Sequence, residues 1–150
     1  MSKRSMVYAG IVLVVALMLW CGRGDAAEQS TVRVMSFNIR YDNPGDGENA
    51  GPHRRDDVAS MIRFHKADIA GVQEALRHQV DELADRLPEY EWFGVGRDDG
   101  KNAGEFMAVF YRPDRLELLE QDTFWLSENP DRPGMGWDAA RNRVVTGGDC

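Results

Sequence analysis

In residues 31–41, apolar residues recur at every second position on both faces of a possible strand. Val32 and Val34 would lie on one face, and Phe37 and Ile39 on the other. Successive side chains of a β-strand point to opposite faces, so this alternation predicts a strand. Because both faces are apolar, the pattern is typical of a strand covered on each side. We therefore expect residues 31–41 to form a strand that lies between two layers.

Two later stretches carry apolar residues at intervals of three and four, which is the spacing of one face of an α-helix. The first covers residues 55–66, and the second begins at Arg77 and ends before Pro88, which cannot continue a helix. The positions on these faces are Val58, Met61, Ile62 and His65 in the first and Val80, Leu83, Ala84 and Leu87 in the second. Two amphipathic helices are therefore expected.

Short apolar runs predict further strands, and turn-forming residues separate them. These strands are expected at residues 68–73, 90–95, 105–111 and 116–126, with a short apolar run at 143–146. The segment 97–102 is dense in Asp, Gly and Asn, so the strands on either side of it are expected to form a hairpin with a long loop. The order strand, helix, strand, helix and then strands indicates an α/β fold.

The N-terminus has the pattern of a secretory leader. Lys3 and Arg4 precede an apolar run at residues 7–20, and small residues stand before a cleavage point after Ala26 or Ala27. This predicts a signal peptide helix over residues 1–27 and a secreted or periplasmic domain over residues 28–150. A membrane anchor formed by an uncleaved leader is the alternative, in which case the protein would contact the membrane.

Composition narrows the class of partner. The chain has 150 residues, a formal net charge of −7 and a pI of about 4.9, which suits one acidic globular domain. An acidic surface does not collect phosphates by counterion release, so no specific nucleic-acid partner is expected. Beyond the leader, Cys150 is the only cysteine, so the domain is expected to have no internal disulfide.

Two oxygen-bearing side chains follow predicted strands. Asn38 lies near the end of the first strand, and Glu74 comes directly after the run at 68–73. Ligands gather at the carboxyl ends of strands in open α/β sheets, and Mg²⁺ takes carboxylate and amide oxygens while keeping several waters. The pair therefore indicates a site for a hard divalent cation. A purely structural pair, in which the carboxylate caps a strand end, is the alternative.

Several segments together resemble a known family. Residues 35–40 (MSFNIR), 67–74 (ADIAGVQE) and 104–112 (GEFMAVFYR) are similar, in order and spacing, to the endonuclease/exonuclease/phosphatase superfamily. Residues 124–128 (FWLSE) and 136–140 (GWDAA) resemble its secreted bacterial branch. The resemblance implies the N-terminal half of a four-layer α/β/β/α sandwich of the DNase I type, preceded by the leader.

The resemblance also implies roles for four residues in the hydrolysis of phosphate mono- or diesters. Asn38 and Glu74 match the residues that hold the catalytic divalent cation, Mg²⁺ or Mn²⁺, and the phosphate. Glu105 matches the glutamate that orients a catalytic histidine. Arg97 lies in a Gly-Arg-Asp-Asp-Gly loop and matches a position near the substrate.

The sequence lacks segments that occur in the second half of the family's proteins. The segments N-T-H-L-D-H and S-D-H, which supply the catalytic histidines, are not found, nor is G-D-x-N, which supplies an Asp and an Asn that bind the leaving and attacking groups. The only histidines are His53, His65 and His78. We therefore expect a truncated copy with little or no turnover. The alternatives are a catalytically inactive secreted binding module and an N-terminally membrane-anchored protein. Exposed sheet edges in a half-sandwich would favour self-association.

Overall fold

The computed structural model describes residues 31–150, and the expected leader lies outside the described residues. The elements are β1 (Val34–Asn38), the 3₁₀-helix η1 (Pro44–Asn49), α2 (Gly51–His65), β2 (Ile69–Ala75), α3 (Arg77–Arg86), β3 (Glu91–Phe93), β4 (Phe106–Tyr111), β5 (Glu120–Trp125) and β6 (Val144–Asp149). Within residues 31–150, no helix has the length and apolar character needed to cross a membrane.

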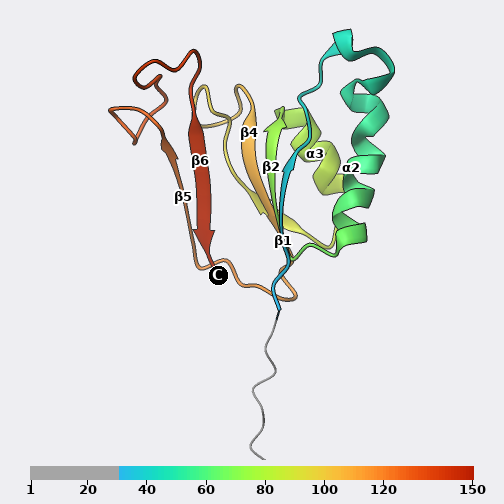
Figure 1. Ribbon diagram of the computed structural model, residues 1–150. Helices are drawn as coiled ribbons and strands as arrows, with labels where there is room; N and C mark the ends of the chain where they lie inside the picture. The colour runs from blue at the N-terminus through green and yellow to red at the C-terminus, as the bar shows by residue number, and fades with distance from the viewer. Residues whose placement is uncertain (1–30) are drawn as a thin grey trace, which may run out of the picture. The chain divides into compact units, whose positions relative to one another are not determined.

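The strands form one four-stranded sheet and one separate pair. The larger sheet has the order β1-β2-β4-β3, in which β1 and β2 are parallel and the other pairs are antiparallel. Parallel neighbours need a long crossover, and α2 lies in that connection. Figure 1 shows α2 and α3 on one side of this sheet and the antiparallel pair β5–β6 on the other. The expected α/β architecture and the hairpin of β3 and β4 are both confirmed.

The core lies between the two helices and the larger sheet. Ile62 on α2 and Val80 on α3 are fully buried against Phe106 and Phe110 of β4. The strand expected at residues 105–111 is confirmed as β4, and its Phe106, Ala108 and Phe110 all face this core. Burial of large apolar side chains contributes about 1.5–3 kcal/mol each, so this layer stabilises the fold.

A buried carboxylate ties three segments together at the start of β2. Asp68 is 1% exposed, and its carboxylate accepts hydrogen bonds from the Arg33 backbone N–H and from the Arg115 guanidinium, both at 2.8 Å. Its backbone carbonyl accepts a further bond from the Arg112 N–H at 3.0 Å. A buried charge is stable only when it is paired and hydrogen-bonded, and Asp68 meets both conditions.

Helix α2 begins four residues earlier than the apolar spacing predicts. It starts at Gly51 rather than Arg55, because the Asp42 carboxylate accepts a hydrogen bond from the Gly51 N–H at 3.0 Å and Pro52 suits the first helical turn. This start signal comes from a residue outside the helix, so periodicity does not reveal it. Met61, expected on the apolar face, is 45% exposed.

The expectation that the first strand lies between two layers is wrong for the described chain. Val32 and Val34 are 43% and 72% exposed, whereas Phe37 on the opposite face packs against the core. The reason is that β1 is an edge strand of its sheet and the second sheet contacts the first through β6 and β4. One face of β1 therefore remains open to solvent.

The last two strands differ in their bounds from those expected. Strand β5 begins at Glu120 rather than Leu116, because the Leu116 N–H bonds to the Arg112 carbonyl and continues a turn. Strand β6 continues to Asp149, past the expected end at residue 146, through two glycines, a residue type that is rare in strands. A Cβ at Gly148 would lie 2.8 Å from the Phe93 ring, so a glycine there allows close approach to β3.

The start of α2 yields a stability prediction. Alanine is normally the better helix former, but a Cβ at position 51 would lie 2.8 Å from the Asp42 side chain. Gly51→Ala should displace Asp42 and break its hydrogen bond to the helix N-terminus, which lowers the free energy of unfolding by about 1 kcal/mol. Urea denaturation followed by circular dichroism measures this. Ser60→Ala, on the exposed side of α2, is the matched control and should not destabilise; an equally stable Gly51→Ala protein would contradict the assignment.

Candidate phosphate and cation site

The parallel pairing of β1 and β2 brings Asn38 and Glu74 together. The register aligns Asn38 with Gln73, so both strands end at the same edge of the sheet. The Asn38 Nδ2 donates a hydrogen bond to Glu74 Oε1 at 2.8 Å, and the Asn38 Oδ1 accepts one from the Arg40 N–H at 3.0 Å. Two residues 36 positions apart in the sequence are thus in direct contact.

A β-bulge decides which way Glu74 faces. In the pairing of β2 with β4, Val72 is opposite Ala108 and Ala75 is opposite Phe106, so Gln73 and Glu74 share one partner position. Without the extra residue, Glu74 would follow Val72 onto the buried face; with it, Ala75 takes that place. Glu74 adopts a positive φ of 64°, a conformation that non-glycine residues enter at a cost. The bulge therefore turns the Glu74 carboxylate away from the hydrophobic core.

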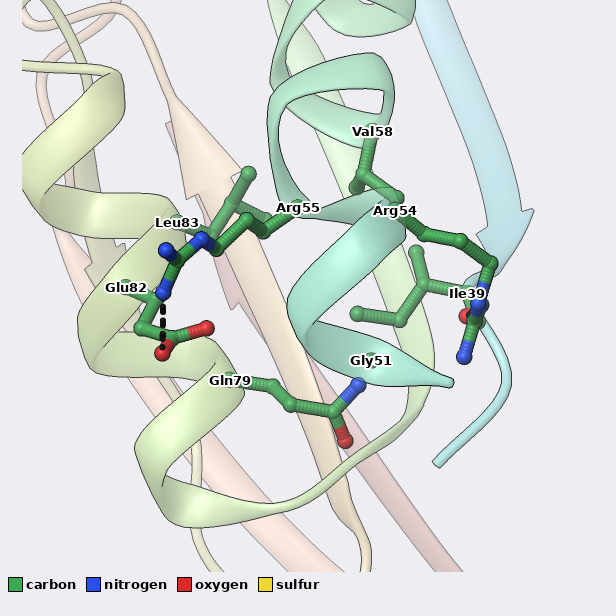
Figure 2. A pocket seen from close by; sticks show the side chains of 8 residues that line it. All are labelled: Ile39, Gly51, Arg54, Arg55, Val58, Gln79, Glu82 and Leu83. Atoms are coloured by element: carbon green, nitrogen blue, oxygen red, sulfur yellow. Dashed lines mark hydrogen bonds and ion pairs between the residues drawn. The ribbon is translucent and has the colours of Figure 1, made fainter. Parts of the chain in front are cut away.

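The chain after β1 is held by two side chains that sequence reasoning missed. The Arg54 guanidinium on α2 donates hydrogen bonds to the carbonyls of Ile39 and Arg40. Gln79 on α3 donates to the Arg40 carbonyl at 3.1 Å and accepts from the Asp42 N–H at 2.8 Å. Figure 2 shows Arg54 beside Ile39, with Gln79 close to the start of α2.

These contacts explain how a turn of unusual geometry persists. Arg40 has a φ of 62°, so both strand ends next to the Asn38–Glu74 contact contain a left-handed non-glycine residue. Such conformations cost about 1–3 kcal/mol each and persist where the surroundings determine them.

Between α2 and α3, the packing leaves a cavity of about 20 Å³, which is water-sized, with an ion pair of Arg55 and Glu82 at its rim (Figure 2).

The second part of the site is a buried ion pair in the β3–β4 hairpin loop. The Arg97 Nη1 donates to Glu105 Oε2 at 2.7 Å, and Arg97 is 7% exposed. The Arg97 Nε has no hydrogen-bond partner in the described part of the chain, and Asp98 Oδ1 lies 3.6 Å from it. The Trp125 Nε1 donates to the Arg97 carbonyl at 2.7 Å, which ties the loop to β5.

The loop also stabilises itself through Asp99. This carboxylate accepts hydrogen bonds from the backbone N–H groups of Ala103 and Lys101 at 2.9 and 2.7 Å. Those bonds, first the one from Ala103, lower the pKa of Asp99. The carboxylate is therefore charged at neutral pH, and the Gly-Arg-Asp-Asp-Gly segment is a formed turn rather than a loose connection.

One cavity joins the two parts. It has a volume of about 450 Å³, within the range of small-molecule sites, and is open on one side. Its charged lining consists of Arg40, Asp42, Glu74, Arg97, Glu105 and Arg141. Of the four residues selected from the sequence, Glu74, Arg97 and Glu105 line the cavity, and Asn38 contacts Glu74. Arg141 and Asp42 were not expected there.

One histidine lies beside this cavity. The His78 Nε2 is 3.1 Å from Asp42 Oδ2, while the other Asp42 oxygen binds the Gly51 N–H. His53 and His65 are exposed residues of α2. The sequence offers no local signal for the Asp42–His78 contact, because the two residues belong to different elements and are 36 positions apart.

The available ligands suit a cation that keeps much of its water. No group of three or more His, Cys, Asp or Glu side chains is arranged as a metal cage within residues 31–150. Glu74 and Asn38 offer one carboxylate and one amide. Within residues 31–150, the Glu74 carboxylate makes no hydrogen bond other than the one to Asn38. Mg²⁺ is commonly held by one or two carboxylates together with water and substrate phosphate. The donor set therefore fits Mg²⁺ or Mn²⁺ rather than a structural metal.

Fold and sequence together define the class of protein. Residues 35–148 match the Endonuclease/Exonuclease/phosphatase family, and the chain belongs to that family. Members of this family generally use divalent metals. The resemblance noted in the sequence is thus confirmed, as is the DNase I type of mixed α/β fold.

Solved structures of Bacteroides proteins are similar to this chain. An endonuclease/exonuclease/phosphatase of Bacteroides vulgatus is 52% identical with a TM-score of 0.76, and the match covers 78% of this chain and 46% of that protein. A mannosyl-6-phosphatase of Bacteroides thetaiotaomicron is 42% identical with a TM-score of 0.76, and the match covers 79% of this chain and 45% of that protein. An endonuclease/exonuclease/phosphatase family protein of the same species is 41% identical with a TM-score of 0.77, and the match covers 79% of this chain and 43% of that protein. The chain spans less than half the length of each.

The buried ion pair predicts an asymmetry between two acidic substitutions. Glu105→Leu would leave the Arg97 guanidinium buried without its carboxylate, and should lower the free energy of unfolding by about 2 kcal/mol. Chemical denaturation measures the loss. Asp114→Leu removes the carboxylate of the more exposed Arg112–Asp114 pair and should change stability little. Equal effects of the two substitutions would show that Glu105 does not stabilise Arg97.

Proposed function

We propose that the cavity is the phosphate- and cation-binding part of a metal-dependent phosphoesterase. The observation that carries the proposal is the Asn38–Glu74 contact of 2.8 Å beside the cavity that the Arg97–Glu105 pair also lines. An oxygen-ligand pair and a buried guanidinium at one cavity are the groups needed to hold a cation and a phosphate together. Phosphate esters are the proposed substrates.

Each residue has a proposed task. Glu74 and Asn38 hold Mg²⁺ or Mn²⁺, and the bound cation supplies Lewis-acid stabilisation of negative charge on phosphoryl oxygens. Arg97 donates hydrogen bonds to a phosphoryl oxygen. Glu105 is a positioning residue, since its carboxylate contacts the Arg97 guanidinium at 2.7 Å and fixes its direction.

No histidine lines the cavity among the described residues; His78 lies beside it and contacts Asp42. The carboxylates that line the cavity already have partners: Glu105 pairs with Arg97, and Asp42 accepts bonds from Gly51 and contacts His78. We therefore propose that this chain binds cation and phosphate with little or no turnover of substrate. Supporting a phosphate monoester as ligand, one similar structure is that of a mannosyl-6-phosphatase.

The location and the contacts of the protein are proposed on sequence grounds. Residues 1–27 have the pattern of a leader, so the domain is proposed to act outside the cytoplasm. Membrane contact would require the leader to remain attached. The open edge and exposed face of β1 support self-association through strand pairing.

Cation binding gives the direct test. The full chain should bind Mn²⁺ with one site per molecule in an electron paramagnetic resonance titration, and Mg²⁺ should compete. Glu74→Gln should weaken binding at least about tenfold, because it removes the only carboxylate of the proposed ligand pair. Glu117→Gln removes an exposed carboxylate elsewhere and should bind as the parent does. Unchanged Mn²⁺ affinity in Glu74→Gln would refute the site.

A hydrolysis assay tests the proposed lack of turnover. With bis-p-nitrophenyl phosphate and Mg²⁺ or Mn²⁺, the full chain should release p-nitrophenolate no faster than its Glu74→Ala variant, because no histidine lines the cavity among the described residues. EDTA should leave the rate unchanged. Metal-dependent release that disappears in Glu74→Ala would show instead that the chain contains a working catalytic base.

A further inference from the structure

The three arginines of the cavity differ in how their charge is compensated. Arg40 donates two hydrogen bonds to Asp46, at 3.0 and 3.2 Å, which lower the pKa of that aspartate. Arg97 is paired with Glu105 at 2.7 Å. Arg141 has no hydrogen bond or ion pair with any residue in the described part of the chain. No described carboxylate is within ion-pair distance of its guanidinium.

The segment that carries Arg141 is held against the Arg97 loop. The neighbouring Asn142 donates from its side-chain amide to the Arg97 carbonyl at 3.3 Å. On the other side, the Leu126 N–H donates to the Arg143 carbonyl at 2.9 Å, and Val144 is buried at the start of β6. Arg141 is therefore an exposed side chain on an anchored backbone, beside a buried arginine whose Nε lacks a hydrogen bond.

We propose that Arg141 is a specificity-determining residue that binds the phosphate of a monoester and favours it over a diester. The inference rests on the proposed function and names the substrate class of the same cavity. A phosphate monoester carries nearly two negative charges at neutral pH, whereas a diester carries one. A guanidinium without a protein counter-ion gains more from the doubly charged group, and its fork of donors matches phosphate oxygens.

The cavity is poorly suited to a nucleic-acid strand. Among the described residues that line it, Tyr41 alone is aromatic, and the Arg40 guanidinium lies over that ring, 4.5 Å from its centroid. Proteins that hold single strands stack bases on open aromatic faces, and this face is already occupied. The observations therefore favour a small monoester whose phosphate is held between Arg97 and Arg141.

Calorimetric binding of two small probes tests the proposal without requiring turnover. At pH 7.5 the full chain with Mg²⁺ should bind methyl phosphate more tightly than dimethyl phosphate. Arg141→Gln should weaken methyl phosphate binding about tenfold, the low end for a hydrogen bond between charged groups, and dimethyl phosphate binding less than about threefold. Arg132→Gln, an exposed loop arginine outside the cavity, should leave both affinities unchanged.

The outcomes separate this inference from the proposed function. If Mn²⁺ binds at Glu74 but Arg141→Gln retains the affinity and preference of the parent, the role of Arg141 is overturned and the cation site stands. If Mn²⁺ does not bind but methyl phosphate binding still depends on Arg141, the cation site fails and the anion site stands. Absence of methyl phosphate binding by the parent chain would overturn the inference. Arg141→Lys should restore only part of the preference, since it keeps the charge and loses the fork.

Discussion

The β-bulge in β2 is the constraint on which the candidate site depends. By inserting Glu74 beside Gln73 opposite a single partner position, it moves the carboxylate off the face that Val72 and Ala75 bury. A charged side chain on that face would lie unpaired among Phe106 and its neighbours, at a high desolvation cost. The same bulge allows Glu74 to meet Asn38 at the end of the parallel strand. Core packing and the polar cluster are therefore two results of one irregularity.

Local patterns were sufficient for most of the elements. A short apolar run identified β4, and three- and four-residue spacing identified both helices. Where the expectations failed, the deciding contact lay outside the element. Asp42 sets the start of α2, the turn at Arg112 delays β5, and the packing of Phe93 allows a glycine in β6. The periodicity of an element does not reveal partners that lie outside it.

The site shows the same division. Strand-end position pointed to Asn38 and Glu74, because parallel strands end at one edge of the sheet, and the resemblance to the family supplied their expected role. Glu105 was selected by resemblance as a partner for histidine, whereas the structure pairs it with Arg97. Arg54 and Gln79, which hold the turn after β1, are ordinary polar residues of helices in the sequence. Their role depends on which carbonyls the fold brings within reach.

The order of the site residues along the chain has a consequence for biosynthesis. Asn38, Glu74, Arg97 and Glu105 all precede the end of β4, and the strands that carry or flank them belong to one sheet. A polypeptide that emerges from the ribosome N-terminus first can assemble these contacts while later segments are still being translated. Arg141 joins only when the segment before β6 has emerged and Asn142 has bonded to the Arg97 carbonyl. The cation end of the cavity can thus form during translation before its anion end is complete.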